Sequence, residues 1–99
     1  MSSMSKACDI SAKVRQEVLK RDNHCCILCG EYNVQIAHYI PRSRGGLGIP
    51  QNLACLCVRC HGDYDNSKYH KQIKSQFKTY LKAVYEDWQE DKLIYSKWR

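Results

Sequence analysis

Cys26-Ile27-Leu28-Cys29 is followed, 28 residues after its second cysteine, by Cys57-Val58-Arg59-Cys60. Two cysteines separated by two residues form a tight turn in which both sulfurs face one metal ion, and four such thiolates are the ligand set of a structural zinc site. A domain of this size has a small core and gains stability from such a metal. The two stretches therefore predict one structural Zn²⁺, bound by Cys26, Cys29, Cys57 and Cys60, that staples a core over residues 24–66.

The other cysteines leave one ambiguity and one alternative. Of seven cysteines, Cys8, Cys25 and Cys55 lie outside these pairs, and an odd number argues against a disulfide framework. Cys25 also precedes Cys29, but at a spacing of four residues. We favour Cys26 as the ligand because its shorter spacing forms the tight turn, after which Gly30 lets the chain turn away. A redox-active Cys-x-x-Cys pair or unpaired structural thiols remain the alternatives.

Length and charge limit the classes of protein to consider. The chain has 99 residues, a formal net charge of +6 and a pI of about 9.0. The length fits one domain, and the positive charge is compatible with nucleic acid as a partner. No run of 18 apolar residues is present, and the N-terminus lacks an apolar stretch. We therefore expect no membrane span, no signal peptide and a cytoplasmic location.

The predicted elements alternate between helix and strand. Residues 1–10 are expected to form a flexible leader, and residues 11–99 a single domain. Apolar residues at helical spacing predict a helix over 11–21, with Asp9 or Ser11 as its N-cap. Alternation predicts a strand over 34–40, which Pro41 ends, and a glycine-rich loop over 42–51 leads to a short second strand over 53–56. A further helix should begin near the second cysteine pair and carry His61.

Residues 70–90 have the longest helical periodicity in the chain. One broad apolar stripe is formed by Ile73, Phe77, Tyr80, Leu81, Val84, Tyr85 and Trp88. We expect this stripe to pack on the domain. Lys74, Lys78 and Lys82 fall on a neighbouring stripe, which predicts either contacts to nucleic-acid phosphates or a solvated face. The pattern does not decide between the two.

Three polar residues lie between or directly after the cysteine pairs. His38 comes at the end of the first predicted strand and precedes Pro41-Arg42-Ser43-Arg44-Gly45-Gly46; Asn52 and His61 follow. Hydrolysis of a phosphodiester needs an activated water, a cation at the phosphate and stabilisation of the leaving oxygen. Histidine suits the first task because its ordinary pKa, about 6.5, lets it accept a proton near neutrality. Taken singly, His38 could be a core residue, Asn52 a turn residue and His61 a zinc ligand.

Together these residues resemble the HNH nuclease family over about residues 14–66. Thirteen residues separate His38 from Asn52, and eight separate Asn52 from His61. The resemblance implies a small α+β fold: a zinc-stapled ββα-metal (His-Me finger) core flanked by an N-terminal helix and a long C-terminal helix. It implies a metal-dependent endonuclease that hydrolyses DNA, with His38 as general base, Asn52 bracing the loop, and His61 holding a catalytic divalent cation, Mg²⁺ or Mn²⁺, with Zn²⁺ or Ni²⁺ as alternatives.

The chain departs from the family pattern directly before the general base. The family often has Asp or His there as a second ligand of the catalytic metal, whereas this chain has Ala37. Asp65 is the candidate replacement, because it lies four residues after His61 and would share one face of a helix with it. Asp63 would point away. The alternative for Asp65 is a surface carboxylate.

The remaining basic residues are candidates for phosphate binding. Arg42 and Arg44 lie on the loop after His38, and Arg59 lies between the second pair of cysteines; a guanidinium matches the geometry of a phosphate. Two other functions stay open: a non-catalytic zinc module that binds nucleic acid with a decayed HNH site, and a protein-interaction module that uses its C-terminal helix. The resemblance also extends to small phage-encoded HNH proteins. It therefore implies that the chain forms a homodimer or acts beside a phage packaging protein.

Overall fold

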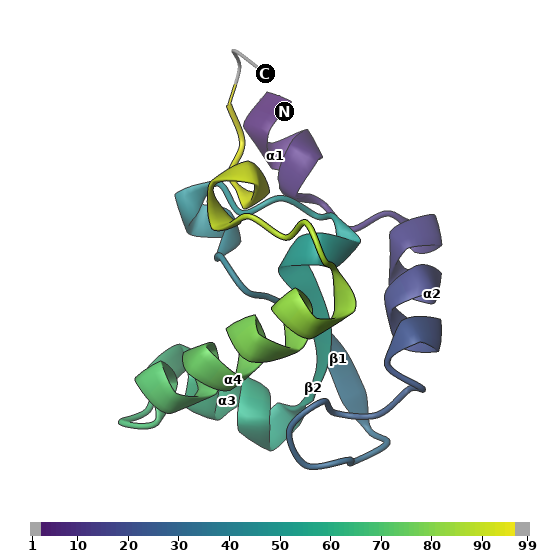
Figure 1. Ribbon diagram of the computed structural model, residues 1–99, viewed down its shortest axis with the longest axis vertical. Coiled ribbons are helices and arrows are strands. Elements are labelled where there is room, and N and C mark those ends of the chain that lie inside the picture. Colours follow the sequence, from purple (N-terminus) through teal and green to yellow (C-terminus); the bar gives the residue numbers. More distant parts are fainter. Residues whose placement is uncertain (1–2, 97–99) are drawn as a thin grey trace.

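The computed structural model describes residues 3–96; residues 1–2 of the expected leader and 97–99 at the end of the expected domain lie outside the described residues. A two-stranded antiparallel hairpin, β1 (Val34–His38) and β2 (Leu53–Cys57), lies at the centre. Figure 1 shows it between α2 (Ala12–Arg21) on one side and α3 (Val58–Asn66) with α4 (His70–Val84) on the other. The predicted small α+β fold is confirmed, and it is consistent with a zinc-stapled ββα arrangement.

Alternation along the hairpin separates two groups of buried side chains. In the register, Ala37 lies opposite Ala54, and Ile36 lies opposite Cys55. Ala37 and Ala54 belong to the larger core cluster, which includes residues of α3 and α4, whereas Cys55 packs with Val18 of α2 and with Ile36. Because successive side chains of a strand point to opposite faces, a hairpin this short can be covered on both sides. This two-sided burial explains why β2 is apolar throughout.

The helix α2 begins as the sequence predicts. The backbone N–H of Val14 donates to Ser11 Oγ at 3.1 Å, so Ser11 is the N-cap and Asp9 is not. Before it, where a flexible leader is predicted, the structure has the short helix α1 (Ser3–Cys8). The side chain of Cys8 is buried, and the N–H of Gly48 donates to the Ala7 carbonyl at 3.0 Å. The described part of the leader is therefore packed on the domain.

The helix α4 ends earlier than its apolar periodicity predicts. Its last residue is Val84 rather than residue 90, and Tyr85 is already extended. The side chains beyond that point are anchored elsewhere: Arg21 Nη1 donates to the Tyr85 hydroxyl at 3.1 Å, and Trp88 Nε1 donates to the Gln51 carbonyl at 2.7 Å. These contacts turn the chain back across the domain. Of the predicted apolar stripe, Ile73, Phe77 and Leu81 are buried, Tyr80, Tyr85 and Trp88 are half-buried, and Val84 is exposed.

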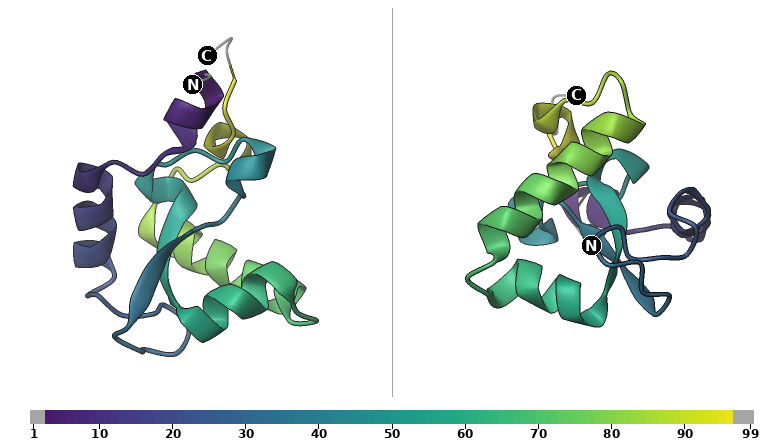
Figure 2. Two further views of the ribbon diagram at one scale, coloured as in Figure 1. Left: turned by 180° about the vertical axis from the view of Figure 1, so that it is seen from behind. Right: turned by 60° about the horizontal axis from the view of Figure 1, so that its bottom comes forward.

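The segment after α4 returns to the loop between the strands. The short helix η3 (Glu90–Leu93) places the carbonyl of Leu93 2.8 Å from the N–H of Leu47, and Ile94 forms a bridge with Gly46. A side chain at Gly46 would place its Cβ 1.7 Å from the carbonyl oxygen of Ile40, so the close packing of Gly46 against the backbone of Ile40 requires glycine. Figure 2 shows this C-terminal segment and α1 beside the same loop. Within residues 3–96, no helix combines the length and apolar character that a membrane crossing requires.

A buried ion pair that the sequence does not predict connects three elements. The side chain of Arg21 lies 2.7 Å from that of Asp22, with only 12% and 0% of the two side chains exposed. Asp22 also accepts from the hydroxyl of Tyr80 and from the N–H of Cys55, and Arg21 donates to the Leu53 carbonyl. The pair therefore joins the end of α2 to β2 and α4.

Asp22→Ala is expected to destabilise the domain by about 3–5 kcal/mol, because it leaves the guanidinium of Arg21 buried without its counter-charge. Urea unfolding followed by circular dichroism measures this loss. The exposed Asp9→Ala change offers a comparison, since a half-exposed pair contributes about 1 kcal/mol or less. Equal stability of Asp22→Ala and the parent would show that the pair is dispensable.

Candidate functional site

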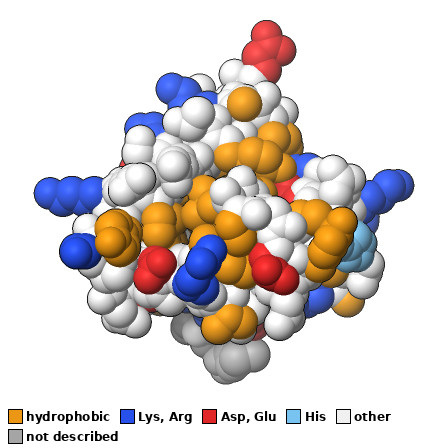
Figure 3. Space-filling model, turned by 90° about the horizontal axis from the view of Figure 1, so that it is seen from below, with side chains coloured by type: hydrophobic (Ala, Val, Ile, Leu, Met, Phe, Trp, Pro, Cys, Tyr) orange, Lys and Arg blue, Asp and Glu red, His pale blue; other side chains and the backbone are white. Residues whose placement is uncertain are grey.

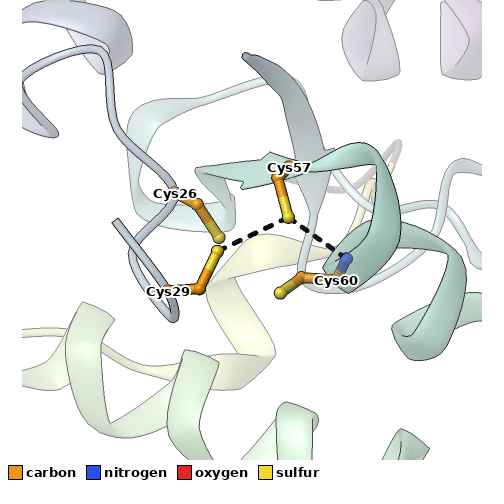
Figure 4. A group of neighbouring side chains, drawn as sticks. All are labelled: Cys26, Cys29, Cys57 and Cys60. Carbon is orange, nitrogen blue, oxygen red and sulfur yellow. Dashed lines mark hydrogen bonds between the residues drawn. The ribbon is translucent and has the colours of Figure 1, made fainter. Parts of the chain in front are cut away.

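Four cysteine sulfurs come together where the two Cys-x-x-Cys turns face each other. The Sγ atoms of Cys26, Cys29, Cys57 and Cys60 all lie within 4.8 Å of one another, and those of Cys29 and Cys57 are 3.6 Å apart. Figure 4 shows the four side chains pointing toward one centre from the first turn and from the junction of β2 with α3. A tetrahedral zinc with bonds of about 2.3 Å separates its sulfurs by roughly 3.8 Å. The cluster therefore has the composition and size for a structural Zn²⁺.

The local backbone explains why these cysteines form the cluster. Asn23 and His24 have positive φ angles of 56° and 57°, and they turn the chain from α2 into the first cysteine pair. Gly30, with φ of 82°, turns it away again. The thiol of Cys25 instead contacts the carbonyl of Asn23, so the choice of Cys26 over Cys25 agrees with the geometry.

A hollow of about 420 Å³ lies on the other side of β1 from the main core. It is lined by Ile10, Ile36, His38, Pro41, Arg42, Ser43, His61 and Asp65. The predicted general base His38 and the predicted ligands of the catalytic cation, His61 and Asp65, therefore meet here, together with Arg42. Ala37 does not, because its side chain is fully buried in the core. An acidic side chain at that position would have to leave the core to reach the hollow.

His38 is held by a backbone carbonyl from the N-terminal part of the chain. Its Nε2 lies 3.0 Å from the carbonyl oxygen of Cys8. A carbonyl can only accept, so Nε2 carries the proton and Nδ1 is left with its lone pair. Partial burial lowers the pKa of His38 below its ordinary 6.5, and the positive charge of Arg42 lowers it further, whereas the Cys8 carbonyl acts in the opposite direction. His38 is therefore neutral, and able to accept a proton, at neutral pH.

His61 has the same kind of support on α3. Its Nδ1 lies 2.8 Å from Oε1 of Gln35, an oxygen that can only accept, so Nδ1 carries the proton. The free Nε2 lies 3.7 Å from Oδ2 of Asp65. Two donor atoms of types that bind divalent cations thus lie close together. Among the described residues, no third His, Cys, Asp or Glu joins them in a metal-binding group.

Asn52 is fully buried behind the hollow and braces the loop. Its Oδ1 accepts from the N–H of Ile40 at 2.8 Å, and its Nδ2 donates to the carbonyls of Ile40 and Leu47, at 3.2 and 2.9 Å. The Asn52 carbonyl also accepts from the N–H of Tyr39 at 2.7 Å. Asn52 thus ties the residues directly after β1 to the middle of the loop. It does not line the hollow itself.

The predicted phosphate-binding residues do not form one surface. Arg42 lines the hollow with His38, whereas Arg44 and Lys74 line a separate one beside Tyr39 and Tyr64. Figure 3 shows Lys and Arg side chains dispersed over one face, with Asp and Glu among them.

On α4, Lys78 lies 3.6 Å from Glu90, and Lys82 is exposed. Arg59 is fully exposed and lines a hollow with Cys29 and Cys57, so it lies at the cysteine cluster rather than beside His38.

Gln35, Cys8 and Asp9 contact the site, although no sequence pattern predicts that they do. Alternation places Gln35 on the opposite strand face from His38, so the sequence gives no reason to select it; its contact with His61 follows from the packing of α3 beside β1. Cys8 contributes its backbone carbonyl, a group that every residue type has, so the sequence could not have revealed this contact.

The fold resembles a solved nuclease structure. The chain superposes on the Type IV phosphorothioation-dependent restriction endonuclease ScoMcrA with a TM-score of 0.67 and 21% sequence identity. The match covers 79% of this chain but only 17% of that one, so the chain corresponds to a small part of its neighbour. At this identity the likeness establishes a shared fold. No family model matches the chain, and the search of curated proteins finds no relative.

Proposed function

We propose that the chain is a metal-dependent HNH endonuclease that hydrolyses phosphodiester bonds of DNA. The observation that carries the proposal is the meeting of His38, His61 and Asp65 in one hollow, with each histidine held in a defined tautomer. The fold shared with a restriction endonuclease supports it. So does the basic charge of the chain, because phosphates dominate the affinity of proteins for DNA.

His38 is the general base in this mechanism. Its free Nδ1 accepts a proton from a water molecule as the water oxygen attacks the scissile phosphorus. A new P–O bond forms, the bond from phosphorus to the 3′ oxygen breaks, and the departing oxygen takes a proton from solvent. By the family resemblance, the products carry a 5′-phosphate and a 3′-hydroxyl. The lowered pKa of His38 keeps the base neutral, and so able to accept a proton, before the substrate binds.

His61 and Asp65 are the residues that would hold the catalytic divalent cation. Because Gln35 accepts a hydrogen bond from Nδ1 of His61, the lone pair on Nε2 is free to bind the cation. Metal-bound histidines usually have such a hydrogen-bond partner on their other ring nitrogen. A bound cation would supply charge neutralisation at the scissile phosphate and at the leaving oxygen. Arg42 lines the same hollow and can bind a phosphate oxygen there. Asn52 keeps the loop in place through its buried amide.

The test is a plasmid-relaxation assay on protein loaded with zinc. Divalent ions are first removed from the buffer, and Mg²⁺ or Mn²⁺ is then added back, so that the structural zinc stays bound. We expect nicked or linear plasmid only after the addition. Binding without cleavage would instead favour the non-catalytic zinc module, which the buried Ala37 and the two-residue metal site support.

Asp65→Ala is expected to weaken binding of the catalytic cation at least as much as the roughly 10–100-fold that loss of an outer-shell partner costs, and to lower activity at limiting metal. Excess Mg²⁺ or Mn²⁺ should restore part of the rate. Zinc content should not change, since the cysteine cluster is separate. Titration of cleavage rate against metal concentration measures the effect.

Asp63→Ala is the matched control, because this carboxylate lies on α3 but does not line the hollow. It should behave like the parent. Full activity of Asp65→Ala at limiting metal would show that the cation is held without this carboxylate.

Replacing Lys74, Lys78 and Lys82 by Ala should weaken binding to all DNA sequences alike if these side chains contact phosphates. Each lost contact should reduce the slope of log K against log salt concentration by about 0.9. Fluorescence anisotropy at several salt concentrations gives the slope, with Lys20→Ala on α2 as the control. An unchanged slope would mean that the lysines form a solvated face.

A further inference from the structure

The linker, residues 7–10, comprises the last two residues of α1 and the two that follow them, and it contacts the hollow from outside the stretch that resembles HNH nucleases. Ile10 is one of the side chains that line it. The N–H of Gly48 donates to the Ala7 carbonyl at 3.0 Å, so the segment is joined to the loop between the strands. Each of the four residues contacts either the loop or a residue that lines the hollow. The whole segment therefore lies against the candidate active site.

The carbonyl of Cys8 accepts hydrogen bonds from two site residues at once. His38 Nε2 and Arg42 Nη1 each lie 3.0 Å from this oxygen. Cys8 is the last residue of α1, and its side chain is only 2% exposed. A carbonyl at the end of a helix has no partner within the helix and is free to accept. One backbone oxygen thereby determines where the histidine ring and the guanidinium lie relative to each other.

Asp9 holds the other side of the same guanidinium. Its carboxylate forms an ion pair with Arg42 Nη2, while Nη1 reaches Cys8. Both side chains are about half exposed, so the ion pair orients the guanidinium of Arg42 more than it stabilises the domain. The fork of Arg42 is thus directed by two consecutive residues of the linker.

Gly48 fits the linker against the loop. A Cβ at this position would lie 2.1 Å from the carbonyl oxygen of Asp9 and 3.0 Å from that of Cys8. Real Cβ atoms do not approach backbone atoms so closely, so a side chain at Gly48 must push the linker away. This contact supplies a way to move the linker without changing any group that faces the hollow.

We propose that residues 7–10 are a positioning element of the active site. The Cys8 carbonyl holds His38 with its proton on Nε2, so that Nδ1 faces the substrate, and Asp9 keeps Arg42 beside it. The inference rests on the proposed function for its catalytic meaning, but the tautomer it assigns to His38 does not depend on activity. The zinc-stapled core by itself therefore does not contain a complete site.

Two variants and one control test the proposal in the full chain. Gly48→Ala displaces the linker, and Asp9→Asn removes the charge that directs Arg42. Glu17→Gln changes an exposed carboxylate on α2 and serves as the control. We expect the single-turnover cleavage rate of Gly48→Ala to fall roughly 10–100-fold, the range in which a misplacement of about 1 Å acts. The cleavage rate of Asp9→Asn should fall by a smaller factor. The zinc content of all three variants should match that of the parent.

The second readout is the tautomer of His38, measured by long-range ¹H–¹⁵N NMR correlation in the zinc-loaded protein without DNA. We expect the Nε2–H form in the parent and in Glu17→Gln, and a mixture of tautomers in Gly48→Ala. The Nδ1–H form in the parent would overturn the proposal, as would an Asp9→Asn variant that cleaves faster than the parent. If the parent holds the Nε2–H tautomer but never cleaves DNA, the proposed function fails while the positioning by Cys8 stands.

Discussion

Cys57→Ser is expected to unfold the domain at 25 °C. Cys57 has three roles: it ends β2, its sulfur accepts from the N–H of Cys60 as the N-cap of α3, and that sulfur lies 3.6 Å from the sulfur of Cys29. The free energy of structural zinc binding is also free energy of folding, about 10–16 kcal/mol in small zinc domains. A domain is stable by only about 5–15 kcal/mol. Loss of one ligand can therefore remove most of the stability.

Elemental analysis and thermal unfolding followed by circular dichroism measure the two expected losses. The parent should carry one zinc per chain, and Cys57→Ser should carry less and lack a cooperative transition. Cys25→Ser is the matched control, because Cys25 is next to the first ligand but lies outside the cluster. It should keep both zinc and stability. A folded, active parent without zinc would refute the role of the cluster.

His38→Ala should reduce cleavage about 10²-fold or more while leaving zinc content and DNA affinity nearly unchanged. A general base acts in the transition state, so its removal lowers the rate and not the binding. Single-turnover rates and anisotropy binding curves measure the two quantities separately. His24→Asn is the control: it changes an exposed histidine, and asparagine tolerates the positive φ of 56–57° found in that turn. If His38→Ala unfolds the domain, or cuts at the parental rate, His38 is a core residue.

The pH dependence of the parent gives a second check on His38. The base works only when neutral, and burial lowers its pKa below 6.5. The rate should therefore persist below pH 6.5 and fall as the pH drops through the lowered pKa. A fall centred above pH 6.5 would contradict this assignment.

Short-range patterns in the sequence determined much of the architecture. The spacing of Cys26 and Cys29, with Gly30 after them, is a property of one turn, so it could be interpreted without a structure. The same is true of Ser11 as the N-cap of α2 and of the alternating strand that becomes β1. In each case the contact that decides the structure lies within a few residues along the chain.

The candidate site could be predicted only in part for the same reason. His61 and Asp65 are four residues apart, so the helical period predicts that they share a face, and the structure brings them to 3.7 Å. That His38 joins them in one hollow follows from the packing of β1 beside α3. The sequence suggested this meeting only through resemblance to a family.

Only the tertiary structure decided which groups hold the two histidines of the candidate site and where the last long helix ends. His38 is held by a carbonyl 30 residues away, and His61 by a side chain 26 residues away. The buried Asp22 accepts from Tyr80, 58 residues later, and α4 stops at Val84 because Tyr85 and Trp88 have partners far back in the chain. Backbone carbonyls are the same in every residue type, and periodicity describes only one helix at a time. Contacts of this kind are therefore determined by how the elements pack, and no local pattern records them.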